Sequence, residues 1–385
     1  IRIIDEEMRH GRDAGGVVQG TEEGALAAAR VYLQYGRISP DDERLVEQFS
    51  QDAVLAAGAA PVAPTPAKAL LKGVAALIAW NRDGNDIRAE DGVLPEALST
   101  AQANFARAFA DPATSHMAHA GDAWIRFLFA SSGLSNYKQA DCQAVFTAIT
   151  ASQVDGSPGA QPLYWQAQCE RKIGQTAEAL RDYARSLDLS MSAGNPQSFD
   201  FAQRTLAMNA YHGVGTTLIA AQSMPDDDRN VRTAVTIARR ACPVAADATG
   251  SPRMKLAVAC LRVAMNLRAS LRQTPNQISG TGENLSFAYL RDSDFQRAFA
   301  NAQSVERTGL FPWTELVRAL GARHVPNAPN AAAVREEADR NISFFEVGAF
   351  NLCELHRLLS DQLYGEAVRI IREQHPHETV DCPTT

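Results

Sequence analysis

Apolar residues recur at spacings of three and four along most of the chain, and no stretch sustains a two-residue alternation. The first pattern is typical of amphipathic helices, so the chain is predicted to be all-α with no significant sheet. Proline and glycine clusters such as Gly194-Asn195-Pro196 mark the breaks between helices. Predicted helices begin at Thr21 and Pro40 and then cover 67–81, 93–110, 115–132, 136–152, 160–174, 176–190, 198–220, 227–242, 252–272, 283–308, 312–322, 331–350 and 351–374.

One segment, YWQAQCERKIGQTAEALRDYARSLDL, carries the clearest pattern. Gly174 ends one predicted helix and the next begins directly after it. Ala179, Tyr183 and Leu187 are four residues apart, which places them on one face of the second helix. Ala167 lies in the middle of the first helix, where a small side chain lets the second helix approach closely. The segment is predicted to be a helix hairpin.

This hairpin resembles a tetratricopeptide repeat (TPR), whose pattern has a small residue, a turn glycine, an alanine and then an aromatic residue. Glu170 departs from it where the pattern usually has tyrosine, and Met191 stands where it often has proline. The resemblance is clear for about 163–190 and degenerate for 67–152. It implies a right-handed α-solenoid of antiparallel hairpins. The matching residues are Ala167, Gly174, Ala179 and Tyr183.

Three regions follow from these patterns. Residues 1–66 are predicted to form an N-terminal arm and a helical hairpin that ends in a Pro/Ala linker. Residues 67–190 are predicted to form the TPR-like repeats. Residues 191–385 are predicted to continue the helical repeats and to end in capping helices and a tail.

In a TPR, outward positions of the first helix line a groove that holds a partner. Transferred to this hairpin, the resemblance implies a site with an aromatic ring, an amide and two cations, which suits an extended or carboxylate-bearing peptide. The alternative is that these side chains are ordinary solvated surface residues. The implied partner-binding residues are Tyr164, Gln168, Arg171 and Lys172.

Charge and hydropathy narrow the classes of partner. The formal net charge is -7 and the sequence pI is about 5.7, which argues against a nucleic-acid binder, because phosphate backbones need a cationic footprint. The longest apolar run, Gly73 to Trp80, is far shorter than the ~20 residues of a membrane-spanning helix. The expected partner is a protein or a peptide, or a larger assembly of proteins.

The chain has six cysteines, which fall into three neighbouring pairs separated by 27, 18 and 29 residues. Each separation is about one helix hairpin, so we expect three disulfides and an oxidising compartment, the periplasm or the cell exterior. The alternative is six buried thiols in a cytosolic protein. The expected pairs are Cys142 with Cys169, Cys242 with Cys260, and Cys353 with Cys382.

Two sets of residues could bind a metal ion. His116, His119 and Asp122 share one broad helix face, but no third strong ligand is recognisable, so surface histidines are favoured. The loop from Asn81 to Asp91 is rich in oxygen ligands. It lacks the glycine and glutamate register of an EF-hand, so a solvated loop is favoured. We expect no metal site and no cofactor.

No recognisable catalytic motif occurs in the chain. Cys353 and His356 could form a thiol–imidazole pair, but Cys382 as a disulfide partner is the simpler interpretation. The tryptophans are expected to lie in the core. The expected function is therefore a non-catalytic protein-binding scaffold. The alternatives are a structural subunit of an envelope or appendage assembly, and the helical non-catalytic region of a cell-wall-active enzyme.

Overall fold

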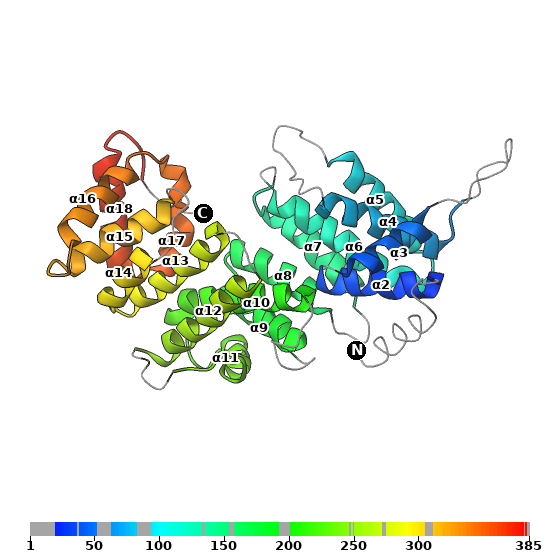
Figure 1. Ribbon diagram of the computed structural model, residues 1–385, viewed down its shortest axis with the longest axis horizontal. Coiled ribbons are helices and arrows are strands. Elements are labelled where there is room, and N and C mark those ends of the chain that lie inside the picture. The colour runs from blue at the N-terminus through cyan, green and yellow to red at the C-terminus, as the bar shows by residue number, and fades with distance from the viewer. Residues whose placement is uncertain are drawn as a thin grey trace. The chain divides into compact units, whose positions relative to one another are not determined.

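The computed structural model describes residues 20–36, 38–51, 63–82, 94–132, 135–153, 158–191, 201–245, 248, 250–271, 275–304, 311–380 and 382, with 201–203 and 275–280 as backbone only. Every regular element in these ranges is a helix, and none is a strand (Figure 1). The predicted all-α class is confirmed. None of the described helices combines the length and apolar character needed to cross a bilayer.

The chain divides into two compact units, Ile1–Leu206 and Ala207–Thr385, with the boundary inside α10 (Phe201–Ala220). In each unit, helices pack mainly on their neighbours in sequence. The three regions predicted from sequence remain a prediction. The first unit contains α2 (Glu22–Tyr35), α3 (Pro40–Ser50), α4 (Pro66–Arg82), α5 (Glu96–Ala108), α6 (Pro112–Ser131), α7 (Gln139–Ala151), α8 (Ala160–Lys172) and α9 (Thr176–Met191). The second contains α11 (Arg229–Ala241), α12 (Pro252–Ser270), α13 (Pro275–Arg291), α14 (Phe295–Ser304), α15 (Pro312–His324), α16 (Ala331–Ile342), α17 (Leu352–Leu358) and α18 (Asp361–Gln374).

Local chemistry sets most helix starts. Ser39, Asp111 and Ser251 each accept a backbone N–H of the first turn, and each is followed by a proline in that turn. The predicted helix at 283–308 is wrong in one respect. It is two helices, because Ser293 has a φ of 61° between α13 and α14. A left-handed serine has no sequence signature comparable to glycine.

The two last predicted helices are also shorter than expected. The first ends at Ile342, and a short 3-10 helix (Val347–Phe350) follows it. The second is divided into α17 and α18, because Ser360 caps a new helix by accepting the N–H of Leu363 at 3.4 Å. The predicted N-terminal arm and most of the Pro/Ala linker lie outside the described residues.

Two glycines let three helices of the first unit pack closely around one aromatic ring. Phe105 of α5 is fully buried. A Cβ atom at Gly73 of α4 would lie 2.6 Å from this ring, and one at Gly121 of α6 would lie 2.4 Å from it. Both distances are well inside van der Waals contact, so these positions accept only glycine at this helix spacing.

Aromatic stacking continues the core toward α8. The Trp124 ring centroid lies 4.9 Å from that of Tyr32 and 5.3 Å from that of Trp165. Trp80, Trp124 and Trp165 are buried, as predicted. Trp313 of the second unit is half-buried, and its indole N–H donates to the Phe350 carbonyl at 2.6 Å. Buried aromatic rings of this size contribute strongly to the stability of a core.

Helices α8 and α9 pack on each other, and the residues that carry the predicted pattern are buried. Gly174, with a φ of 88°, ends α8 and turns the chain into α9. Ala167 and Ala179 are fully buried, as are Tyr183 and Leu187. The small residues of both helices and the larger residues of α9 therefore belong to the buried core.

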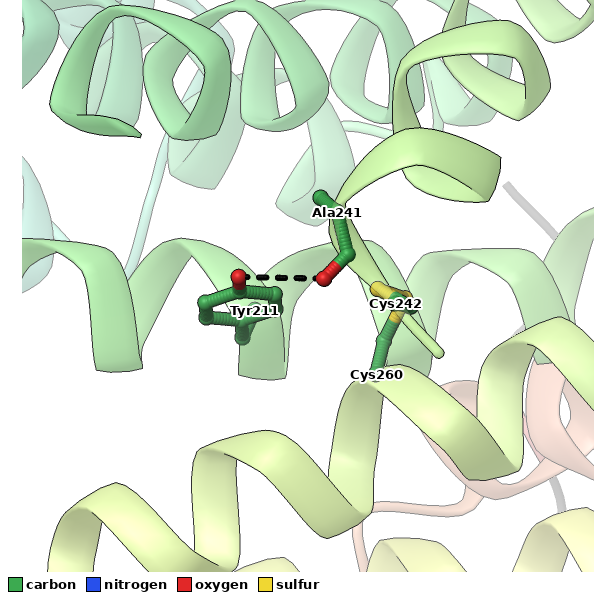
Figure 2. The surroundings of a disulfide bond; sticks show 4 residues. All are labelled: Tyr211, Ala241, Cys242 and Cys260. Atoms are coloured by element: carbon green, nitrogen blue, oxygen red, sulfur yellow. Dashed lines mark hydrogen bonds between the residues drawn. A yellow bond between two sulfur atoms is a disulfide. The ribbon is translucent and has the colours of Figure 1, made fainter. Parts of the chain in front are cut away.

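Two of the three predicted disulfides are present. Cys242 at the end of α11 bonds to Cys260 of α12, and Cys353 of α17 bonds to Cys382 in the tail. Figure 2 shows the first of them, beside a hydrogen bond of 3.2 Å from the Tyr211 hydroxyl to the Ala241 carbonyl. The last turn of α11 is thus connected covalently to α12 and by a hydrogen bond to α10.

Candidate functional site

The four predicted partner-binding residues lie on one face of α8. Tyr164, Gln168 and Lys172 are four residues apart, and Arg171 is seven residues from Tyr164, so all four share an arc of about 100°. Every one of them is half-buried. The Gln168 amide donates to the Tyr164 hydroxyl at 2.5 Å, so the structure connects two of the predicted residues directly.

A further aromatic residue, Tyr137, joins this surface. The Lys172 Nζ atom lies 5.7 Å from the Tyr137 ring centroid, within cation–π range. Burial raises the pKa of the Tyr137 hydroxyl, and the nearby Arg171 charge opposes that shift. We use the name α8 surface for Tyr137, Tyr164, Gln168, Arg171 and Lys172.

Sequence reasoning missed Tyr137 because it lies outside α8. It precedes α7, in the turn Ser135-Asn136-Tyr137, where Asn136 and Tyr137 have φ values of 46° and 59°. This turn directs the chain back along α6, where the Tyr137 N–H donates to the Ala130 carbonyl at 2.6 Å. The asparagine was the available signal, because it tolerates the left-handed region.

The Tyr164 ring is held in place from below. Its centroid lies 5.8 Å from that of Tyr183 of α9, with the rings at 60° to each other. This edge-to-face contact is a favourable arrangement for aromatic pairs. The α8 surface therefore has a fixed aromatic base, with the two cations of α8 at one end.

The third predicted disulfide is absent. Cys142 of α7 and Cys169 of α8 are free, fully buried thiols. The hydrogen bond with Cys142, together with burial, raises the pKa of the Cys169 thiol far above its ordinary value. The same hydrogen bond lowers the pKa of the Cys142 thiol, so the environment disfavours the thiolate form at Cys169. The sequence spacing correctly paired these two cysteines in space but did not predict their redox state.

On the opposite side of α8, Glu170 and Asp182 form a buried acidic pair. Asp182 accepts hydrogen bonds from Arg181 Nε at 2.6 Å and Arg181 Nη2 at 2.7 Å. Glu170 accepts one from Gln166 at 3.0 Å. Burial, together with the Asp182 charge, raises the pKa of Glu170 to about 8. Glu170 replaces the tyrosine of the TPR pattern, and it is a packed side chain rather than part of the α8 surface.

In the His116, His119 and Asp122 motif of α6, the side chains of Asp122 and His119 contact other residues of the protein. Asp122 accepts from Arg126 Nε at 2.6 Å and from Gln102 at 3.0 Å. The His119 ring stacks on Phe109 with centroids 4.1 Å apart. Burial lowers the pKa of both His116 and His119. Within the described residues, no group of three or more ligand-type side chains could hold a metal ion.

The other two candidate sites are the Cys353 and His356 pair and the oxygen-rich loop. Cys353 is bonded to Cys382, so it is not a thiol nucleophile beside His356. The oxygen-rich loop lies outside the described residues from position 83 to position 93.

Comparison with known proteins identifies no relative of this chain. No protein-family model matches the chain, and neither the curated proteins nor the solved structures include a significant match.

Proposed function

We propose that the protein is a non-catalytic scaffold that docks a segment of a partner protein on the α8 surface. Its architecture in this proposal is a right-handed, TPR-like solenoid of antiparallel hairpins. The packing of helices in neighbouring pairs and the buried small residues of α8 and α9 support this architecture.

The observation that carries the proposal is the fixed group of two tyrosines, an amide and two cations on the α8 surface. Tyrosine and arginine are enriched at the energetically important positions of protein interfaces. Tyr164 is held by Tyr183 and Gln168, so it loses little side-chain entropy when a partner covers it. Arg171 and Lys172 supply charge for carboxylates of the partner segment.

The disulfides support a location outside the reducing cytoplasm. Cys242–Cys260 and Cys353–Cys382 connect helices or the tail to neighbouring elements. Structural disulfides of this kind are typical of secreted and periplasmic proteins. We propose the periplasm or the cell exterior as the compartment in which the partner is met.

The test compares the partners retained by wild type and by a double variant, Tyr164→Ala with Arg171→Ala, after purification from the native host. Because Tyr164 packs on Tyr183, a second variant, Arg171→Gln with Lys172→Gln, changes charge and leaves the aromatic packing intact. Arg30→Ala with Arg107→Ala is the control, since both arginines are exposed on other helices of the first unit. Selective loss of a partner in the α8 variants is expected. Full retention in both would reject the assignment.

A further inference from the structure

Helix α11 of the second unit has a strongly basic exposed face. Its sequence RNVRTAVTIARRA contains four arginines and no acidic residue, in a chain with a net charge of -7. Val231, Ala234, Ile237 and Ala238 form the buried side of the helix. The arginines fall on the opposite, exposed side at positions 229, 232, 239 and 240.

A hollow of about 310 Å³ lies between this helix and the start of α12. Arg232 and Arg239 lie along it, and Val235 and Pro252 supply apolar surface. We call it the α11–α12 groove. Its complete lining is Asp226, Val231, Arg232, Val235, Thr236, Arg239, Pro252 and Arg253.

Of the three arginines that line the groove, Arg253 has an acidic partner among the described residues, and Arg232 and Arg239 do not. Arg253 is largely buried, and its guanidinium donates to the Asp226 carboxylate and to the Ala221 carbonyl. That ion pair neutralises the single acid of the lining. Arg232 and Arg239, by contrast, make no side-chain hydrogen bond or ion pair with any residue that the structure describes. Two cations are thus available to an incoming anion.

The groove is built on a fixed pair of helices. The Cys242–Cys260 disulfide joins the end of α11 to α12, and the Tyr211 hydroxyl holds the Ala241 carbonyl (Figure 2). At the other end, Asp228 accepts the N–H groups of Asn230 and Val231 at 2.8 and 3.0 Å. A site that is ordered before binding loses less entropy when it is occupied.

We propose that the α11–α12 groove binds an acidic peptide segment of a partner protein. Arg232 and Arg239 are seven residues apart, about 10 Å along the helix axis. Carboxylates three residues apart on one side of a polyproline II segment are about 9 Å apart, so two of them match these arginines. Each guanidinium can hold a carboxylate in a bidentate arrangement. An apolar side chain between the two acids would contact Val235 and Pro252.

This proposal does not rest on the α8 surface, which belongs to the other unit. An experiment can therefore reject one of the two proposals without rejecting the other. If Arg171→Ala abolished binding of the acidic peptide, the peptide would occupy the α8 surface, and the groove assignment would be rejected. We expect that variant to bind the peptide as wild type does.

The probe is a fluorescein-labelled synthetic peptide in which every third residue is Glu and the others are Ala, titrated with the full chain and followed by fluorescence anisotropy. The matched peptide has Gln in place of Glu. We expect the Glu peptide to bind, the Gln peptide not to bind, and added NaCl to weaken the complex, since exposed charges are screened by salt. Equal binding of both peptides would overturn the proposal.

The variant is Arg232→Gln with Arg239→Gln. Loss of two exposed ion pairs should weaken binding about five- to tenfold. The control is Arg335→Gln with Arg369→Gln, which removes the same charge from exposed positions of α16 and α18 in the same unit. Equal weakening by both pairs would show a nonspecific charge effect and reject the site. Binding to phosphatidylglycerol vesicles without binding to the Glu peptide would assign the arginines to a lipid surface and also reject it.

Discussion

Glu170 of α8 and Asp182 of α9 accept hydrogen bonds from the same nitrogen, Gln166 Nε2, at 3.0 and 2.8 Å. Their side chains are only 5% and 1% exposed. Asp182 also receives two hydrogen bonds from Arg181. Glu170 has no partner for Oε2 among the described residues. The pair therefore accommodates one negative charge well, and Glu170 is the member that retains a proton.

This arrangement predicts that the packed helices α8 and α9 lose stability as pH rises. The pKa of Glu170 is about 8 in the folded chain, against an ordinary value of 4.5. The contribution of protonated Glu170 to folding stability is fully present below the ordinary pKa of this carboxyl group. It is lost as pH rises through the pKa that Glu170 has in the folded chain. We expect a loss on the order of 2–5 kcal/mol between pH 5 and pH 9. Hydrogen exchange of the α8 and α9 amides across this range measures it.

Glu170→Gln should remove most of this pH dependence, because the amide cannot ionise. The exposed Glu96 of α5 offers the control, and Glu96→Gln should leave the pH dependence unchanged. A Glu170→Gln protein in which α8 and α9 lost stability with rising pH as steeply as in wild type would show that another group is responsible.

Close packing around Phe105 gives a second prediction. Gly121→Ala places a Cβ atom where the Phe105 ring now lies. Overpacking of this kind costs about 1–3 kcal/mol, and the gain in helix propensity, about 1 kcal/mol, offsets only part of it. Urea unfolding followed by tryptophan fluorescence should show a lower midpoint.

Gly365→Ala in α18 is the matched control, since no atom lies within 4 Å of the position that its new Cβ atom would take. It should raise the stability of the second unit by about 0.5–1 kcal/mol through helix propensity. Phe105→Leu in the Gly121→Ala background should recover part of the loss. No recovery would mean that the Phe105 contact is not the cause.

Much of the fold was predictable from local sequence, and the exceptions have physical causes. The turn at Gly174 and the starts after Ser39 and Ser251 depend on neighbouring residues only, so the pattern predicted them. The helix predicted to begin at 115 begins three residues earlier, directly after Asp111. The break at Ser293 was not predicted, because a serine with a left-handed backbone has no local sequence signature comparable to glycine.

The candidate site was predictable in part. The TPR resemblance indicated the face of α8, but Tyr137 comes from another turn and joins it only through tertiary contacts. The α11–α12 groove carries no motif. Its arginines are visible in the sequence, but the unsatisfied charges and the hollow beside them depend on how Arg253 pairs with Asp226.

The thiols give a third prediction. In denaturant without reductant, an alkylating reagent should modify two cysteines, Cys142 and Cys169. After reduction it should modify all six. In native buffer neither free thiol should react, because both are fully buried. Intact mass measures each state, and no modification in denaturant before reduction would mean that a third disulfide forms.

Site-specific photo-crosslinking tests most directly whether a partner contacts the α8 surface. A photoreactive phenylalanine analogue placed at Lys172 in the native host should give a crosslinked species of defined mass. The same analogue at the exposed Arg107 of α5 should give none. Absence of a crosslink at Lys172, or the same products at both positions in normally expressed protein, would contradict the proposal that this surface docks a partner.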